Sequence, residues 1–204
     1  MSSSDRLSYG ARRFLSRYLR DLDTGTREHI FEVINMCRRL GEIFELSETE
    51  FELLILAAQY HDLGKGNKLI SPLIQQPRAP TSQEWAIINR HPEFSGRILK
   101  ATGGVAEEVI NLILAHHDPV TYQGKYLKIL VVLGVADMIQ AMTSKRPYRK
   151  DPMEKGDVIF EIQLKYGGLI EIIGGEPALW ELFSYLVRSK KEESSSPLFM
   201  SPGL

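Results

Sequence analysis

Five histidines and two aspartates are the side chains of this chain that are best suited to bind metal ions. The histidines are His29, His61, His91, His116 and His117. Asp62 directly follows the second histidine, and Asp137 lies inside an apolar run. Imidazole nitrogen combined with carboxylate oxygen suits Mn, Fe, Co, Ni or Zn in open sites that also hold water. The residue types therefore predict divalent metal ions. Of these metals we expect Fe or Mn, with Zn, Ni or Co as alternatives.

Each of these residues also has a plainer explanation. A single histidine is more often a half-buried residue whose hydrogen bonds are satisfied, and Asp137 could cap a helix or pair with an arginine. A buried carboxylate without a partner is strongly unfavourable, so Asp137 needs a donor, a cation or a metal. The pairs at 61–62 and 116–117 both fall where helices are expected to end, and the helix dipole favours cations there. The joint pattern favours metal binding.

Helices must position these side chains. Apolar residues recur at intervals of three and four, and alternating β-branched runs are missing, which predicts an all-α fold. We expect helices over residues 12–20, 26–40, 47–62, 105–117, 127–142 and 176–189, and further helices that begin at Thr81 and Asp151. Ser47 with Glu50 and Thr81 with Glu84 form candidate capping boxes. Pro92 should interrupt or restart a helix near His91.

The composition limits the class of protein. A hydrophobic fraction of 43% and a charged fraction of 25% over 204 residues are typical of a single globular domain. We expect an amphipathic helix within residues 1–22, the main domain at 23–189 and a disordered tail at 190–204. The net charge of -1 gives no general attraction to duplex nucleic acid.

Two further features concern the location of the protein. No apolar run approaches the roughly 20 residues that span a bilayer, so we expect a cytoplasmic protein without membrane contact. The single cysteine, Cys37, cannot form an internal disulfide, and it is expected to be a buried apolar residue.

A series of motifs follows a fixed order along residues 26–165. The motifs are His29, His61-Asp62-Leu63-Gly64-Lys65, His91-Pro92-Glu93, His116-His117, Val135-Ala136-Asp137 and the run from Ala141 to Arg149. This ordered set resembles the HD superfamily of metal-dependent phosphohydrolases, and within it the HD-GYP branch. The resemblance implies an HD-domain helical bundle with the metal site between helices.

The resemblance also implies two metal ions. The first would be held by His29, His61, Asp62 and Asp137. The second would be held by His91, His116 and His117, with Asp62 as the bridge. Two cations about 3.5 to 4 Å apart activate a shared water and stabilise charge on the oxygens of a phosphoester. This chemistry makes Asp62 and Lys65 the candidate catalytic residues.

Four residues are candidates for substrate binding. Lys65 follows the His-Asp pair closely and could direct its ammonium at a phosphate oxygen, although a solvated loop lysine is the alternative. Arg146 and Arg149 offer planar guanidinium groups to a second phosphate, with a solvated basic turn as the alternative. Tyr122 could stack on a guanine base or simply cover the edge of the core.

The sequence departs from the branch in several places. The segment from Asp118 to Tyr126 lacks the Gly-Tyr-Pro tripeptide, and Asp118 replaces a glutamate. Gln140 stands where members of the branch commonly have a further acid. Gly25 stands where three-metal members have a glutamate, so two metals are favoured.

The resemblance implies a phosphodiesterase that acts on a small phosphoester, such as cyclic di-GMP or a linear dinucleotide, through an altered substrate loop. The alternative is a signalling module that binds a cyclic dinucleotide or a signalling protein partner, with weak or no turnover. A metal-free HDOD-type interaction domain is a third possibility, but it conflicts with the retention of all the expected ligands.

Overall fold

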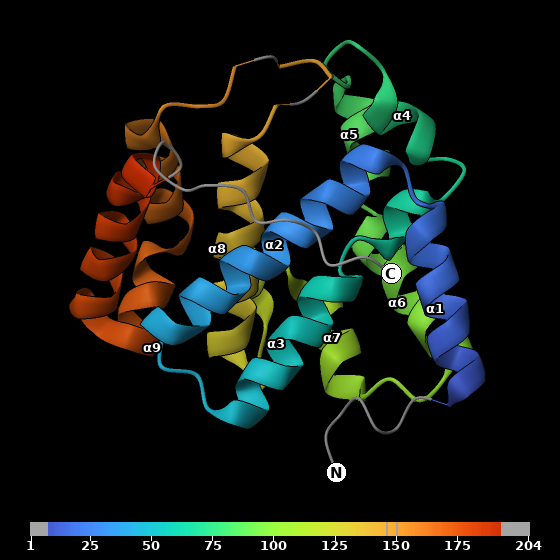
Figure 1. Ribbon diagram of the computed structural model, residues 1–204, viewed down its shortest axis with the longest axis horizontal. Coiled ribbons are helices and arrows are strands. Elements are labelled where there is room, and N and C mark those ends of the chain that lie inside the picture. The colour runs from blue at the N-terminus through green and yellow to red at the C-terminus, as the bar shows by residue number, and fades with distance from the viewer. Residues whose placement is uncertain (1–7, 146, 150, 193–204) are drawn as a thin grey trace.

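The fold is described from a computed structural model, which covers residues 8–145, 147–149 and 151–192 (Figure 1). Every regular element in these ranges is a helix, as the sequence predicted. The elements are α1 (Tyr9–Asp21), α2 (Thr24–Ile43), α3 (Glu48–Tyr60), η2 (Leu63–Gly66), α4 (Ser71–Gln75), α5 (Ser82–Ile88), α6 (His91–Thr102), α7 (Glu107–Ala115), η3 (Pro119–Thr121), α8 (Leu127–Thr143) and α9 (Lys155–Glu192).

Helix α8 lies at the centre of the core. It packs against α2, α3 and α9, and Figure 1 shows α2 crossing in front of it. Every residue from 129 to 136 is buried, which is typical of a helix that is apolar on all sides. Asp137 follows this buried run directly, so the core of the molecule fixes its position.

Local sequence signals produced several of the expected boundaries. Both capping boxes form, at Ser47 with Glu50 and at Thr81 with Glu84. Helix α5 ends before His91, and α6 begins at that residue with Pro92 in its first turn. These boundaries confirm the predicted helix starts and the predicted junction.

The C-terminal part differs from the expectation of two helices. Asp151 does not cap a helix, because α9 begins at Lys155 and the amide of Val158 donates to the carbonyl of Glu154 at 3.1 Å. The helix expected at 176–189 is part of α9, which contains Pro177. A proline removes one backbone donor from a helix, and a long packed helix tolerates this loss.

The remaining expectations concern the ends of the chain and Cys37. Helix α1 is amphipathic and contacts α6 and η2, with Leu15 buried. Cys37 is buried and forms no disulfide, as predicted. No helix in the described ranges is long and apolar enough to cross a membrane. Most of the tail expected to be disordered, residues 193–204, lies outside the described residues, as do residues 1–7.

Candidate metal centre

His61 and Asp62 lie just beyond the end of α3, where a close contact with α6 holds them. Ser95 on α6 accepts a hydrogen bond from the amide of Gly64 at 2.8 Å and donates one to the carbonyl of His61 at 2.7 Å. A side chain at Gly64 would overlap the carbonyl oxygen of His91. Only a glycine permits this approach, which brings the His-Asp pair next to His91.

The candidate ligands converge into two groups of three. The first group is His29, His61 and Asp137, and the second is His91, His116 and His117. Within each group the ligand atoms lie within 4.8 Å of one another. Asp137 is partly buried and His117 is exposed, whereas the other four side chains are buried. These two groups could hold divalent metal ions.

Asp62 lies between the two groups and is completely buried. Its Oδ2 is 3.1 Å from Nε2 of His29 and 3.3 Å from Nε2 of His61. Its Oδ1 is 3.1 Å from Nε2 of His91. Each carboxylate oxygen therefore faces a different group, which is the arrangement of a bridging ligand.

Four of the imidazoles share one orientation. In each, Nδ1 meets a carbonyl oxygen: Ala58 O at 2.7 Å for His61, Ile88 O at 2.9 Å for His91, Ile113 O at 2.6 Å for His116, and the side-chain Oε1 of Gln140 for His29. A carbonyl oxygen only accepts hydrogen bonds, so each of these Nδ1 atoms carries a proton, and each ring turns its Nε2 toward the interior of the site. Proteins orient metal-binding histidines in this way.

Without a cation, the inward-facing atoms lack suitable partners. The Nε2 atoms of His91 and His116 are 3.4 Å apart, and in rings that carry their proton on Nδ1 both of these nitrogens are acceptors. Among the described residues, Nε2 of His29, Nε2 of His61 and Oδ1 of Asp62 are buried atoms with no hydrogen-bond partner. Because buried polar atoms are normally satisfied, these atoms fit a site that binds metal.

The electrostatics of the site also favour cations. Burial alone would raise the pKa of Asp62, but His61, Lys65 and His91 outweigh it and hold that pKa well below its usual range. Burial, followed by the neighbouring imidazoles, holds the pKa of His116 well below that of a free histidine. At neutral pH the centre therefore combines an ionised carboxylate with a neutral imidazole, and both are available to a metal.

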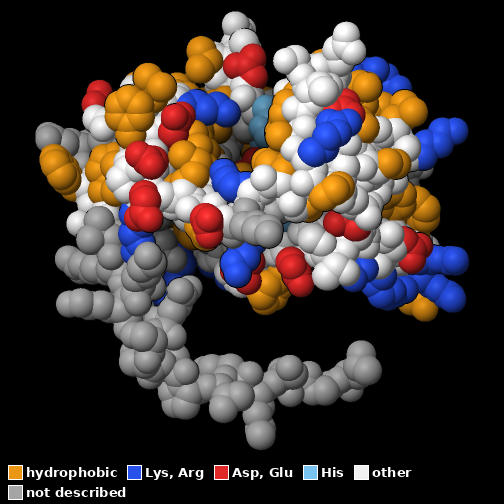
Figure 2. Space-filling view, turned by 90° about the horizontal axis from the view of Figure 1, so that it is seen from above, with side chains coloured by type: hydrophobic (Ala, Val, Ile, Leu, Met, Phe, Trp, Pro, Cys, Tyr) orange, Lys and Arg blue, Asp and Glu red, His pale blue; other side chains and the backbone are white. Residues whose placement is uncertain are grey.

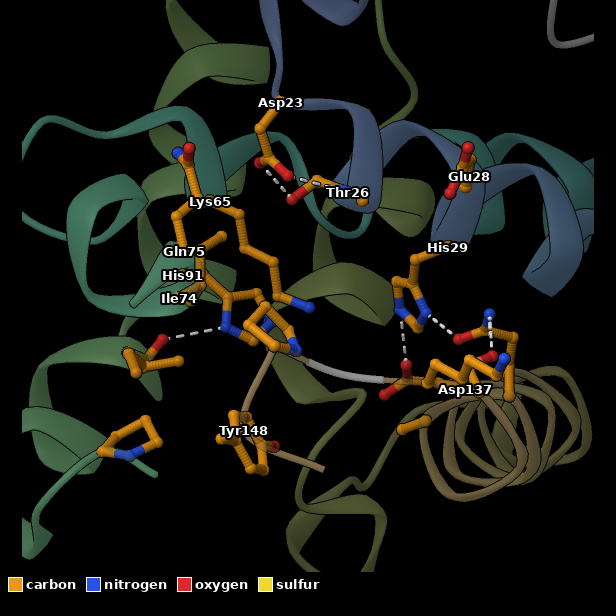
Figure 3. Close-up of a pocket in the computed structure, with 18 of the residues that line it drawn as sticks. Asp23, Thr26, Glu28, His29, Lys65, Ile74, Gln75, His91, Asp137 and Tyr148 are labelled. Carbon is orange, nitrogen blue, oxygen red and sulfur yellow. Dashed lines mark hydrogen bonds and ion pairs between the residues drawn. The ribbon is translucent and has the colours of Figure 1, made fainter. Parts of the chain in front are cut away.

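Members of both groups line a pocket of about 990 Å³: His29 and Asp137 from the first, and His91 and His117 from the second. Figure 2 shows a hollow on this face of the molecule, with histidine in pale blue inside it. Lys65 extends from η2 into the pocket (Figure 3). Its Nζ donates to Oδ2 of Asp62 at 2.6 Å. The sequence-predicted ammonium group therefore lies beside the carboxylate that separates the two groups.

Comparison with protein families decides what kind of domain this is. The family model described as "HD domain" matches residues 26–142, which is more than half of the chain. The chain belongs to the HD domain family. The matched range contains all seven candidate ligands, and the match confirms the superfamily that the motifs indicated.

Several curated relatives of this HD domain are phosphodiesterases. A 3'3'-cGAMP-specific phosphodiesterase of Vibrio cholerae is 29% identical over 157 residues, covering 72% of this chain and 29% of that protein. A cyclic di-GMP phosphodiesterase of Thermotoga maritima is 27% identical over 193 residues, covering 89% of this chain and 51% of that protein. The matched part of this chain therefore spans 29% of the length of the first relative and 51% of the length of the second.

A solved structure shares the fold. The HD domain of the Listeria monocytogenes phosphodiesterase PgpH, in complex with cyclic-di-AMP, matches with a TM-score of 0.57 at 15% identity. The match covers 91% of this chain and 99% of the PgpH chain. The likeness confirms the all-α HD bundle.

Two of the residues expected to bind substrate, Arg149 and Tyr122, are not among the residues that line this pocket. Arg149 instead donates from Nη2 to the carbonyls of Ala141 and Met142 at 2.6 and 2.9 Å, because the last carbonyls of α8 have no partner within the helix. Tyr122 is half-buried and packs against the core, which corresponds to its plainer explanation. Arg146 lies outside the described residues.

The structure also adds residues that the sequence did not single out for these roles. Trp85 and Tyr148 line the pocket beside the histidines. Gln140 accepts from His29 through Oε1 and donates from Nε2 to Ser144 at 2.6 Å. The sequence marked Gln140 only as a departure from the branch, although an amide one helical turn after Asp137 was a signal for this role.

Proposed function

We propose that this HD domain is a binuclear metal-dependent phosphodiesterase that hydrolyses a small cyclic or linear dinucleotide. The observation that carries this proposal is the position of Asp62, with one oxygen 3.1 Å from His91 and the other 3.1 Å from His29. The named activities of the relatives support the same reaction class. The pocket volume of about 990 Å³ is at the upper end of the range for small-molecule sites, which suits a dinucleotide.

Each group, together with one oxygen of Asp62, would hold one ion. His29, His61 and Asp137 would form the first site, and His91, His116 and His117 the second. The mixed nitrogen and oxygen donors suit Fe or Mn, and they are compatible with Zn, Ni or Co. When bound, two such ions supply an activated water and stabilise charge on the reacting phosphoester oxygens.

In this proposal, Lys65 donates a hydrogen bond to the phosphate group of the substrate. Its ammonium group lies 2.6 Å from Asp62 and belongs to the pocket lining. An ammonium in this position would donate to a nonbridging phosphate oxygen and stabilise the negative charge that grows there during hydrolysis. Lys65 would thus contact the substrate rather than a metal.

A second candidate function is a module that binds a cyclic dinucleotide with weak or no turnover. The segment 118–126, where the tripeptide of the branch is missing, contributes no residue to the pocket lining. A pocket that lacks this wall would hold a ligand less tightly in its reactive position. The expected cytoplasmic location and the signalling protein partner stay predictions.

The decisive experiment measures metal content and hydrolysis on the same preparation. The full chain is purified anaerobically with Fe or Mn supplied, and its metals are determined by elemental analysis. Cyclic di-GMP, 3'3'-cGAMP and linear pGpG are then incubated with the protein, and products are separated by chromatography. Two ions per chain with hydrolysis that Asp62→Ala abolishes would support the enzyme.

The other outcomes are equally informative. Two ions with tight ligand binding but no product would favour the binding module. A content well below one ion per chain would overturn the metal centre itself.

A further inference from the structure

Two aromatic side chains stand together in the lining of the metal pocket. Trp85 on α5 and Tyr148 after α8 have ring centroids 6.4 Å apart and ring planes at 90°. The two residues remain 39% and 37% exposed. Two rings in this edge-to-face arrangement form a corner with aromatic walls, and part of each ring is open to a ligand.

Trp85 lies close in the chain to the residue that orients His91, a member of the second group. Ile88 lies one helical turn after Trp85 on α5, and both residues line the pocket. The carbonyl of Ile88 accepts the hydrogen bond from Nδ1 of His91 at 2.9 Å. The indole therefore stands one turn from the group that orients a candidate metal ligand.

Tyr148 is held by the end of α8. The neighbouring Arg149 donates to the carbonyls of Ala141 and Met142, and the amide of Met153 donates to the carbonyl of Met142 at 3.0 Å. These bonds fold the segment after α8 back onto the helix that carries Asp137. In the view of Figure 3, Tyr148 lies on the opposite side of the pocket from Asp23.

We propose that Trp85 and Tyr148 form a nucleobase subsite, in which one base of a dinucleotide stacks while its phosphate lies between Lys65 and the histidine groups. This inference rests on the proposed function, because it takes the ligand to be a dinucleotide. A flat heteroaromatic ring fits a corner of this kind, since it can stack on one ring and meet the other with its edge. Such stacking is sequence-tolerant, because every base has a π-face.

The two tryptophans of the chain allow a direct test. Trp180 lies on α9, is 63% exposed and does not line the pocket. In the full-length Trp180→Phe variant, Trp85 is the only indole, and its fluorescence should be quenched by linear pGpG and by GMP. Ribose 5-phosphate, which has no base, should cause no quenching. The matched Trp85→Phe variant, which keeps Trp180, should show no response to any of these ligands.

Binding of linear pGpG to metal-loaded protein gives the second readout. Trp85→Ala should weaken this binding roughly tenfold, the effect expected from losing one stacked base, while metal content and affinity for ribose 5-phosphate stay unchanged. Trp85→Phe should retain most of the affinity, because a phenyl ring still stacks. An unchanged pGpG affinity in Trp85→Ala, or an equal loss for ribose 5-phosphate, would overturn the subsite.

These outcomes separate the subsite from the proposed reaction. Quenching of Trp85 fluorescence without hydrolysis would support the nucleobase subsite and contradict the proposed enzymatic function. If Trp85→Ala did not change the rate of hydrolysis, the result would support the proposed enzyme and contradict the nucleobase subsite.

Discussion

Nε2 of His91 lies 3.1 Å from Oδ1 of Asp62, the carboxylate oxygen that faces away from the first histidine group. The two residues are brought together by Gly64, whose backbone packs against the carbonyl of His91. The bridge between the two candidate metal sites is therefore a consequence of how η2 packs on α6.

The first prediction concerns the number and grouping of the metals. Asp62→Ala should lose both ions, because it removes the carboxylate that gives one oxygen to each group. Asp137→Ala and His117→Ala should each lose mainly one ion, since each belongs to one group only. Elemental analysis and metal titration measure these losses. A variant whose loss ignores the grouping would show that the ligands are assigned to the wrong sites.

The second prediction separates Lys65 from the metal ligands. Lys65→Ala should keep both ions and slow hydrolysis, with a loss of about 2 to 4 kcal/mol in transition-state stabilisation, as for one electrostatic donor. Single-turnover kinetics with matched metal content would measure the effect. Lys68→Ala is a suitable control, because Lys68 is exposed and does not line the pocket. Loss of metal in Lys65→Ala would contradict the assigned role.

Local signals in the sequence predicted much of the helical framework. Ser47 and Thr81 begin helices because their side chains and a glutamate three residues later satisfy the first free amides. Pro92 marks the start of α6 for a different local reason, because a proline has no amide hydrogen to satisfy in the first turn and its fixed φ suits a helix. By contrast, Pro177 does not end a helix: α9, which packs against α8, continues through it despite the loss of one backbone donor.

The candidate metal ligands and Lys65 were recognisable in the sequence, but the other residues that line the pocket were not. Histidine and aspartate in a fixed order indicate metal binding before any geometry is known. An arginine is different, because a guanidinium can donate to carbonyl oxygens as well as to phosphate oxygens, and Arg149 donates to carbonyls at the end of α8. Trp85 and Tyr148 come from segments far apart in the chain, so only the folded structure reveals that they are neighbours.

The third prediction concerns Gln140, which accepts from Nδ1 of His29. Gln140→Leu removes this acceptor and should weaken metal binding at the first group by about 10-fold to 100-fold, as for other residues that orient metal ligands. The second group should bind metal normally. Gln140→Glu restores an acceptor and should preserve binding. Equal weakening of both sites in Gln140→Leu would indicate a general loss of structure instead.

The fourth prediction tests the packing beneath the metal centre. Burial raises the pKa of the Cys37 thiol, so little of it is the reactive thiolate at neutral pH. A thiol reagent such as DTNB should leave the native protein unmodified and should modify one cysteine per chain after unfolding in guanidinium chloride. Rapid modification of the native protein would mean that α2 opens readily around Cys37.

The fifth prediction compares two glycines in different surroundings. An alanine at Gly64 would overlap the carbonyl oxygen of His91, so Gly64→Ala must move η2 away from α6 and carry Asp62 with it. We expect a loss of about 1 to 3 kcal/mol in the free energy of unfolding, typical of overpacking, together with loss of metal. Thermal unfolding and elemental analysis would measure both.

Gly168 on α9 provides the matched control, because an added methyl group there would meet nothing within 4 Å. Gly168→Ala should stabilise the protein by about 0.5 to 1 kcal/mol, since alanine restricts the unfolded chain and favours helix. Its metal content should stay normal. If Gly64→Ala kept both ions and full stability, the close contact between η2 and α6 would not be what positions Asp62 beside His91.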